Sequence, residues 1–402
     1  MPSGVLFQVS HFINLGSKLK SLLRKLALPL DKEPKMSVTR TVFAFGNIYN
    51  KESTESEKTS YLVENSSTSK MIVGFRELDG FTFTLTGDFG IEFDAGISIN
   101  AMLAGGLRDD ALVYTSVLAK NGVIFQQDVL TGITLAQVLD EGNTLQAQQN
   151  YFSGNDIFIA LDNSESEEND QVWGYGGNDT FSNASFDGLY AERFYGGDGV
   201  DTLVLMSART EFDLKAVNTV WNEDTKANDL KGFEILNSTT EEKLMELNEV
   251  ERVQFTDTNI ALDTDGATSA GGIYRLYKAA FDREPDTGGL GYWIGRADAG
   301  VKSAVEIAVD FTWSTEFQNL YGITTTDNYG TGSDVKDLVT GFYENVLDRS
   351  PDAGGLDYYT GVIESNEKTV GRVLAEISDS KENYDNTITD IQNGIPYDLW
   401  LS

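Results

Sequence analysis

The glycine- and aspartate-rich loops between residues 151 and 205 constrain the fold of this chain more than any other feature. The stretch "WGYGGNDTF" (173–181) places three glycines, an asparagine and an aspartate in six consecutive positions. A simple reversal of the chain direction needs one glycine. Several glycines together indicate left-handed backbone at several positions, which glycine adopts at little cost and asparagine next best. We therefore expect these loops to turn their own carbonyl groups toward a common point.

Related loops recur along this segment. The stretch "GGDGVDTLV" (196–204) matches every defined position of the nonapeptide G-G-x-G-x-D-x-U-x, in which U is a large apolar residue, and 174–182 departs from it only at Tyr175. Partial matches occur at "SGNDIF" (153–158) and "NDQVW" (169–173), and Asp170 and Asp179 lie nine residues apart. The candidate metal-binding positions are Gly154, Asn155, Asp156, Asn169, Asp170, Gly174, Gly176, Gly177, Asn178, Asp179, Gly196, Gly197, Gly199 and Asp201.

Calcium is the ion that suits such loops. It is a hard cation that takes six to eight oxygen ligands, and backbone carbonyl groups supply many of them. The aspartate adds an anionic ligand, and the apolar residue two positions later begins a short strand that enters the core. The sequence therefore predicts two or three calcium ions between stacked turns. One alternative stays open, in which the loops are ordinary Gly-Asn-Asp turns between strands.

The chain is strongly acidic. It carries 63 Asp and Glu against 30 Lys and Arg in 402 residues, a formal net charge of −33. This charge argues against nucleic acid as a partner, because phosphate backbones require a basic face. It also opposes compaction unless cations neutralise part of it, so we expect bound cations to be structural.

The residue types that most enzymes use are scarce. The chain has no Cys and a single His, His11. Disulfides, thiolate metal sites and Cys nucleophiles are therefore excluded, and a Ser-His-Asp triad or a His-ligated zinc would have to recruit His11. We expect no catalytic residues and no enzyme. The alternative that stays open is a secreted, carboxylate-dependent hydrolase of the glycosidase type, with its acids in 37–150.

The chain divides into a β-rich part and a helical part, so the predicted fold class is multidomain β + α. Residues 1–36 form a basic extension, which is either a membrane-surface or transit segment or lies ahead of a start at Met36. Residues 37–150 are β-rich, since "FTFTLTG" (81–87) alternates strictly. Residues 151–263 are predicted to form a short parallel β-roll with a flanking cap. No apolar run approaches the roughly 20 residues of a transmembrane helix.

Residues 271–386 form a duplicated helical module. "LYKAAFDREPDTGGLGYWIG" and "FYENVLDRSPDAGGLDYYTG" align without gaps, with Asp348 of the second copy 66 residues after Asp282 of the first. Asp286 and Asp352 follow a proline and are placed to cap the next helix. A metal site of EF-hand type at Asp282 and Asp286 is the alternative, but Trp293 stands where such a site needs an acid.

Aromatic side chains gather in the same module. Tyr292, Trp293, Tyr358 and Tyr359 lie in equivalent pairs of the two copies. We expect them in the helical core, because aromatic residues carry much of core burial. A platform that stacks on carbohydrate rings is the alternative.

At its glycine-aspartate loops the chain resembles the repeats-in-toxin (RTX) family of secreted bacterial proteins. The resemblance implies a parallel β-roll, calcium as the bound cofactor, calcium-dependent folding, and export by type I secretion machinery with an uncleaved C-terminal signal. Residues 387–402 are the tail in which that signal is expected. The matching loops span only about 55 residues, fewer than the family's long arrays.

The helical module resembles a bacterial domain of unknown function that is similar in part to phycobilisome-linker repeats. The motif "AAFDREPDTGGLGYW" carries this resemblance. Together the two resemblances imply a secreted, extracellular protein with a structural, surface-layer, matrix or adhesion role, in contact with cell-surface glycan or matrix. A scaffold that docks partners through its helical repeats is a further alternative, beside the hydrolase.

Overall fold

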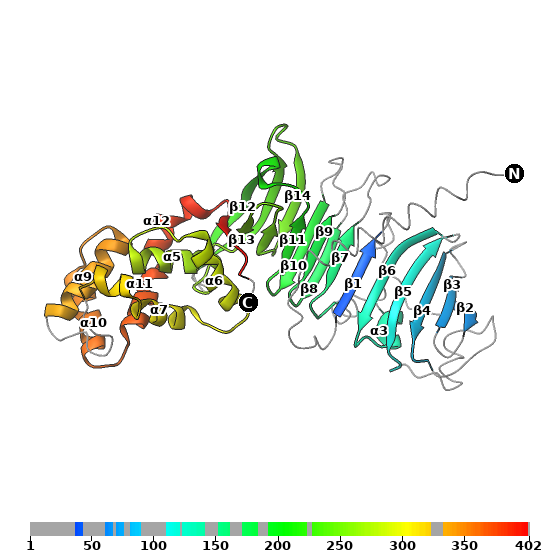
Figure 1. The fold of residues 1–402 in the computed structure, drawn as a ribbon, viewed down its shortest axis with the longest axis horizontal. Coiled ribbons are helices and arrows are strands. Elements are labelled where there is room, and N and C mark those ends of the chain that lie inside the picture. The colour runs from blue at the N-terminus through cyan, green and yellow to red at the C-terminus, as the bar shows by residue number, and fades with distance from the viewer. Residues whose placement is uncertain are drawn as a thin grey trace. The chain divides into compact units, whose positions relative to one another are not determined.

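The structure is a computed structural model of the 402-residue chain. It describes residues 37–42, 61–66, 70–75, 81–89, 110–120, 123–140, 152–160, 171–183, 192–222, 227–322 and 333–400. The basic extension 1–36 lies outside the described residues. The predicted order of a β part followed by a helical part is confirmed (Figure 1).

The described strands of the β part form two sheets. The larger one consists, in sheet order, of β17 (Ile395–Tyr397), β16 (Asn259–Ala261), β15 (Arg252–Gln254), β11 (Thr202–Leu205), β9 (Thr180–Asn183), β7 (Ile157–Ala160), β1 (Ser37–Val42), β6 (Val123–Thr131), β5 (Val113–Lys120), β4 (Phe81–Gly87), β3 (Lys70–Phe75) and β2 (Tyr61–Ser66). The smaller one consists of β12 (Phe212–Asn222), β13 (Ala227–Asn237), β14 (Lys243–Asn248), β10 (Glu192–Asp198) and β8 (Gln171–Gly176).

Strand β1 joins two kinds of pairing within the larger sheet. It runs antiparallel to β6, which belongs to the antiparallel series β2 to β6, and parallel to β7. From β7 the sheet continues through β9, β11 and β15 with parallel pairing. One continuous sheet therefore crosses residue 150, where the sequence suggested the start of a separate segment.

The parallel strands of the two sheets alternate along the chain. The chain passes from β8 to β9, from β10 to β11 and from β14 to β15, each time from the smaller sheet to the larger. Between β11 and β14 the antiparallel hairpin of β12 and β13 is inserted. Side chains of both sheets form one core, in which the Phe181 and Phe194 rings lie 5.4 Å apart. Burial of these apolar faces sets the register of the strands.

The remaining elements among the described residues are helices. They are α3 (Leu135–Asp140) and η2 (Arg209–Glu211) in the β part, and α5 (Ala270–Phe281), α6 (Thr287–Asp298), α7 (Ala304–Thr312), α8 (Thr315–Leu320), α9 (Ser333–Leu347), α10 (Ala353–Glu364), α11 (Val370–Ser378) and α12 (Lys381–Ile391) in the helical part. The predicted C-terminal tail begins inside α12 and includes β17, which pairs with β16. No helix among the described residues is long and apolar enough to cross a bilayer.

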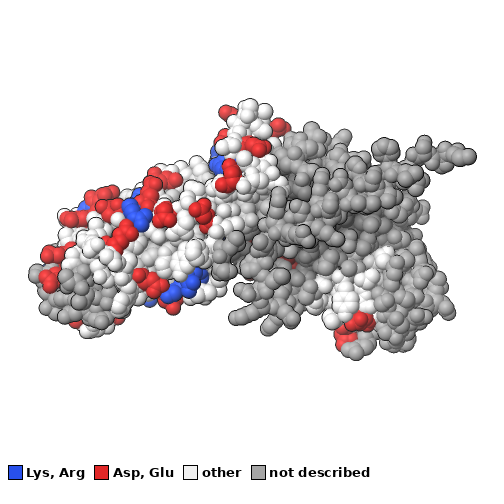
Figure 2. All heavy atoms as spheres, in the orientation of Figure 1, with Lys and Arg blue, Asp and Glu red and all other residues white. Residues whose placement is uncertain are grey.

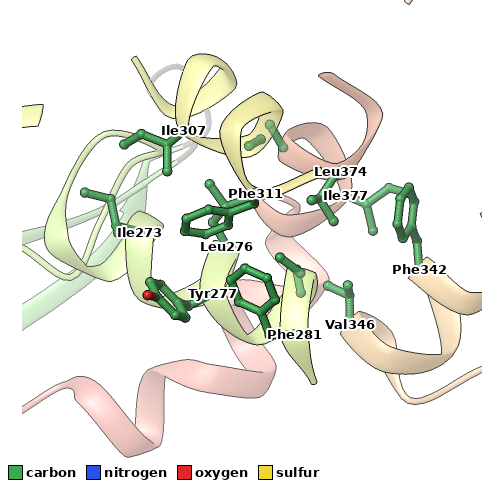
Figure 3. Packing of buried hydrophobic residues seen from close by; sticks show 14 of the residues in the cluster. Ile273, Leu276, Tyr277, Phe281, Ile307, Phe311, Phe342, Val346, Leu374 and Ile377 are labelled. Atoms are coloured by element: carbon green, nitrogen blue, oxygen red, sulfur yellow. The ribbon is translucent and has the colours of Figure 1, made fainter. Parts of the chain in front are cut away.

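Helix α5 is the centre of the helical core. Each of its residues except Lys278 is buried, and it contacts α6, α7, α8, α9, α11 and α12. Figure 3 shows Leu276 and Phe281 of α5 pointing toward Phe311 and the side chains of α11. Apart from Lys278, the whole surface of α5 is therefore buried, as expected of a helix enclosed by others.

The predicted helix caps are confirmed. Asp286 accepts a hydrogen bond from Gly289 N at 2.7 Å, and Asp352 accepts one from Gly355 N at 2.9 Å. The ion pairs Arg283–Glu316 and Arg349–Glu382 are equivalent in the two copies, both with 2.6 Å between Nε and Oε1. On the face drawn in Figure 2, acidic side chains are spread over the helical part with a few basic ones between them.

The four aromatic residues of the module divide into two kinds. Trp293 and Tyr359 pack against the helical core, as predicted. Tyr358 is 51% exposed, and Tyr292 makes edge contacts with Trp293 and with the exposed Trp400. The core expectation therefore holds for the second aromatic of each pair and not for Tyr358.

Candidate metal centre

Four turns of the β part lie side by side, each just before one of the neighbouring strands β7, β9, β11 and β15 of the larger sheet. Three of them connect the smaller sheet to the larger: 177–179 between β8 and β9, 199–201 between β10 and β11, and 249–251 between β14 and β15. The fourth, 154–156, leads into β7. Thr180 lies opposite both Ile157 and Thr202, and Thr202 lies opposite Arg252. The last residue of each turn directly precedes one of these paired residues, so the last residues of the four turns are aligned with one another.

The aligned residues are all acidic, and we call Asp156, Asp179, Asp201 and Glu251 the carboxylate ladder. Asp156 N donates to Asp179 Oδ1, Asp179 N donates to Asp201 Oδ1, and Asp201 N donates to Glu251 Oε2, each at 2.7 Å. One carboxylate oxygen of each later turn is thus occupied by the turn before it. Charge-assisted hydrogen bonds of this kind are short and strong, so they fix the position of each side chain.

Main-chain hydrogen bonds also stack the turns, with the later turn donating to the earlier one. Thr180 N donates to Asp156 O and Thr202 N donates to Asp179 O, both at 2.8 Å. Beside the ladder, Asn178 N donates to Asn155 Oδ1 at 2.8 Å, and Val200 N donates to Asn178 Oδ1 at 3.1 Å. The asparagines therefore bridge successive turns.

The second carboxylate oxygen is the unusual feature of the ladder. Asp179 and Asp201 are 1% and 0% exposed, and their Oδ2 atoms are buried with no hydrogen-bond partner. A buried carboxylate oxygen without a partner is costly, because the charge has lost its hydration. Both oxygens are therefore suited to a bound cation, which would supply the missing interaction.

Glycines make room for these oxygens. A Cβ atom added to Gly174 would come within 3.0 Å of Asp179 Oδ2 and Gly196 O, and one added to Gly196 would come as close to Asp201 Oδ2 and Glu249 O. At each of the two positions a free carboxylate oxygen and a main-chain carbonyl oxygen, that of Gly196 in β10 or that of Glu249, thus converge over a glycine Cα. Two oxygens of this type, facing the same space, are the start of a hard-cation site.

Left-handed backbone occurs at the second and fourth positions of the nonapeptide, where the pattern has glycine. Gly177, Gly197 and Gly199 have φ values of 112°, 101° and 143°. Tyr175, which replaces a glycine of the pattern, lies opposite Gly197 and has a φ of 68°. This conformation is strained for a residue with a bulky side chain. The turn geometry is therefore kept at 175 despite the substitution.

Burial and mutual proximity disturb the ionisation of the ladder. Desolvation raises the pKa of Asp179 to about 9, with Coulombic repulsion from Asp156 and Asp201 adding to it. Desolvation likewise raises the pKa of Asp201 to about 7 and that of Glu251 to about 8. Without a cation, negative charge on these side chains is therefore disfavoured near neutral pH.

Calcium fits the residues present. The donor set is made of carboxylate and carbonyl oxygens, and the unpartnered Oδ2 atoms of Asp179 and Asp201 are the anionic ligands that it would need. Across the described residues no three Asp, Glu, His or Cys side chains form a metal-holding group. A site of this kind therefore depends on main-chain oxygens, with the buried aspartates supplying charge.

The structure brings most of the predicted positions together. Gly154, Asn155, Asp156, Gly177, Asn178, Asp179, Gly199 and Asp201 lie in the aligned turns, and Gly174, Gly176, Gly196 and Gly197 lie at the ends of β8 and β10 that lead into them. Asn169 and Asp170 lie outside the described residues, so the turn expected there stays a prediction.

Glu249 and Glu251 are the members of this region that sequence reasoning missed. The segment 248–252 has no glycine, and Glu251 lies 50 residues after Asp201, with the β12–β13 hairpin between them. One signal was present. Val253 follows Glu251 by two positions, as the apolar residue follows the aspartate in the nonapeptide.

The β part thus carries a set of stacked acidic turns, and the helical part is a tandem of two similar units. Residues 264–321 and 324–387 each match the model of a family described as a domain of unknown function (DUF4214). This agrees with the expected duplication, and it places the match in the helical part. No curated protein matches the chain.

Proposed function

We propose that this chain is a calcium-binding extracellular protein of the repeats-in-toxin type, whose β part folds around calcium ions. The observation that carries the proposal is the pair of buried, unpartnered oxygens, Asp179 Oδ2 and Asp201 Oδ2. Each faces a main-chain carbonyl oxygen, that of Gly196 or that of Glu249, over a glycine. One calcium ion at each of these two places would satisfy the carboxylate oxygen there.

Calcium dependence gives the acidic composition a physical role. At a net charge of −33 the metal-free chain repels itself, and its buried carboxylates oppose closure of the turns. In a calcium-poor cytosol such a chain stays loose enough to pass through a type I secretion channel. Outside the cell, calcium in the range of roughly 10⁻⁴ to 10⁻³ M that suits extracellular modules drives folding.

The proposed role is structural and not enzymatic. We propose that the folded protein acts in a surface layer, in matrix or in adhesion. After export, the calcium-bound β part would be the folded support of the tandem helical units outside the cell. Cell-surface glycan or matrix is the expected partner. The exposed Tyr358 and Trp400 are surface aromatics of the helical part that such a partner would contact.

Metal analysis tests the proposal. The purified full chain is dialysed against millimolar calcium, and bound calcium per chain is measured by atomic emission, with an Asp179→Asn/Asp201→Asn double variant as the control. We expect about two ions in the natural chain, fewer in the variant, and a change in circular dichroism when a chelator removes them. A natural chain that binds no calcium, with an unchanged spectrum, would overturn the proposal.

A further inference from the structure

The turn 249–251 repeats the geometry of a calcium turn without its sequence. It stands in line with 199–201, and Glu251 takes the place of the next aspartate by accepting the hydrogen bond from Asp201 N at 2.7 Å. The turn is shorter than its neighbour. Asn248 lies opposite Tyr195 and Arg252 opposite Thr202, so the three residues 249–251 stand where the neighbouring segment has the six residues 196–201.

The oxygen over Gly196 is nevertheless in place. Over Gly174, the carbonyl oxygen that approaches Asp179 Oδ2 belongs to Gly196. Over Gly196, the carbonyl oxygen that approaches Asp201 Oδ2 belongs to Glu249. Glu249, which belongs to a turn without glycine, therefore supplies the carbonyl oxygen over Gly196. Gly196 itself supplies the equivalent carbonyl oxygen over Gly174.

Glu249 adopts an unusual backbone conformation in this position. Its φ is 51°, in the left-handed region that non-glycine residues avoid. The conformation costs on the order of 1 kcal/mol, so it is kept only where the surroundings demand it. The carboxylates of Glu249 and Asp198 also act electrostatically on Asp201, which increases the negative potential around its free oxygen.

We propose that the glycine-free turn 249–251 closes a calcium site with the turn 199–201, in which Asp201 Oδ2 and the Glu249 carbonyl oxygen are ligands. Glu251, the last member of the carboxylate ladder, keeps Asp201 in position by accepting the hydrogen bond from its main-chain N. This inference rests on the proposed calcium function and assigns to it a site that the nonapeptide pattern does not contain. The ion class is a hard divalent cation with oxygen ligands.

Backbone variants of the full chain test the site. Glu249→Gly retains access to a φ near 51° and keeps the carbonyl oxygen, so the chain should keep this ion, with an affinity lowered only by the loss of the carboxylate near Asp201. Glu249→Pro fixes φ near −65° and moves the carbonyl oxygen away, so the chain should lose one bound ion. Asp201→Asn should lose the same ion. The double variant Asp201→Asn/Glu249→Pro should therefore bind as many ions as either single variant. Asp179→Asn, which acts on the space over Gly174, should remove a different ion additively.

Calcium titration calorimetry in chelator-treated buffer measures these losses, and circular dichroism in saturating calcium checks that each variant folds. If Glu249→Pro does not fold, Glu251→Gln decides, because it keeps the shape and an acceptor for Asp201 N and removes the charge. We expect it to weaken one ion by about 10- to 100-fold. Full, unweakened binding in the folded Glu249→Pro variant, or in Glu251→Gln where the proline variant does not fold, would overturn this inference. It would leave the proposed function intact, which fails only if the natural chain binds no calcium.

Discussion

Arg252 Nη2 lies 2.7 Å from Asp298 Oδ1, and this contact joins the end of the carboxylate ladder to the last turn of α6. Arg252 is 3% exposed, and its guanidinium also pairs with Asp263, whose carboxylate accepts a hydrogen bond from Ala270 N at the start of α5. Its main-chain N donates to Asp201 O at 2.9 Å. A single residue thus contacts both the ladder and the helical part.

Breaking the Arg252–Asp298 pair should destabilise the protein. Burial lowers the pKa of Arg252, but Asp263 and Asp298 raise it more, so the guanidinium stays charged and needs both carboxylates. Asp298→Asn should cost about 2 kcal/mol, because a buried charge loses part of its compensation. Urea unfolding at fixed calcium measures this cost.

The exposed ion pair Arg283–Glu316 provides the matched control. Its side chains are 40% and 48% exposed, so Glu316→Gln should change the free energy of unfolding by no more than about 0.5 kcal/mol. Equal effects of Glu316→Gln and Asp298→Asn would show that burial of Arg252 is unimportant.

Replacing Asp179 should have opposite effects with and without calcium. In chelator, Asp179→Asn removes a buried carboxylate whose pKa is raised to about 9, and its amide can donate to the Gly196 carbonyl that faces it. The variant should then unfold at a higher temperature than the natural chain. In millimolar calcium it lacks a ligand and should unfold at a lower one. Thermal unfolding under both conditions checks this reversal, and a shift of the same sign in both would contradict it.

The metal-free protein should become less stable as pH rises. The pKa values of Asp179, Asp201 and Glu251 are raised to about 9, 7 and 8, so the folded state binds more protons than the unfolded state. Stability is then greatest near the ordinary carboxyl pKa of about 4 and falls as pH rises toward the raised values. In chelator, the unfolding temperature should be lower at pH 8 than at pH 5.5.

The same ladder variants serve as the control for this pH dependence. Asp179→Asn/Asp201→Asn removes two of the three titrating groups, so its unfolding temperature should vary less with pH. A natural chain whose metal-free stability rises between pH 5.5 and pH 8 would disprove the prediction.

Two helical glycines should respond to alanine in opposite directions. A Cβ at Gly361 in α10 meets no atom within 4 Å, so Gly361→Ala should stabilise by about 0.5–1 kcal/mol through helix propensity. A Cβ at Gly291 in α6 would overlap the main chain of Asp398, so Gly291→Ala should destabilise. Chemical unfolding compares the two. Stabilisation by Gly291→Ala would mean that the C-terminal segment does not pack on α6.

Local features of the structure could be predicted from the sequence. The caps at Asp286 and Asp352 each lie within four consecutive residues, and Gly177 and Gly199 adopt a conformation that glycine favours. The burial of α5 on all sides could not be predicted in this way, because its periodicity shows which face is most apolar but not how many helices enclose it.

The turns, the helix caps and the candidate oxygen ligands can be read from the sequence, because those properties reside in neighbouring residues. The pairing of β1 with the parallel strands and the position of Glu249 and Glu251 beside the distant Asp201 become visible only in the folded chain. Register between distant strands is set by burial of a common core, which brings together residues from separate parts of the chain. That core includes Phe181, Leu203 and Val253, and no short pattern within one strand encodes it.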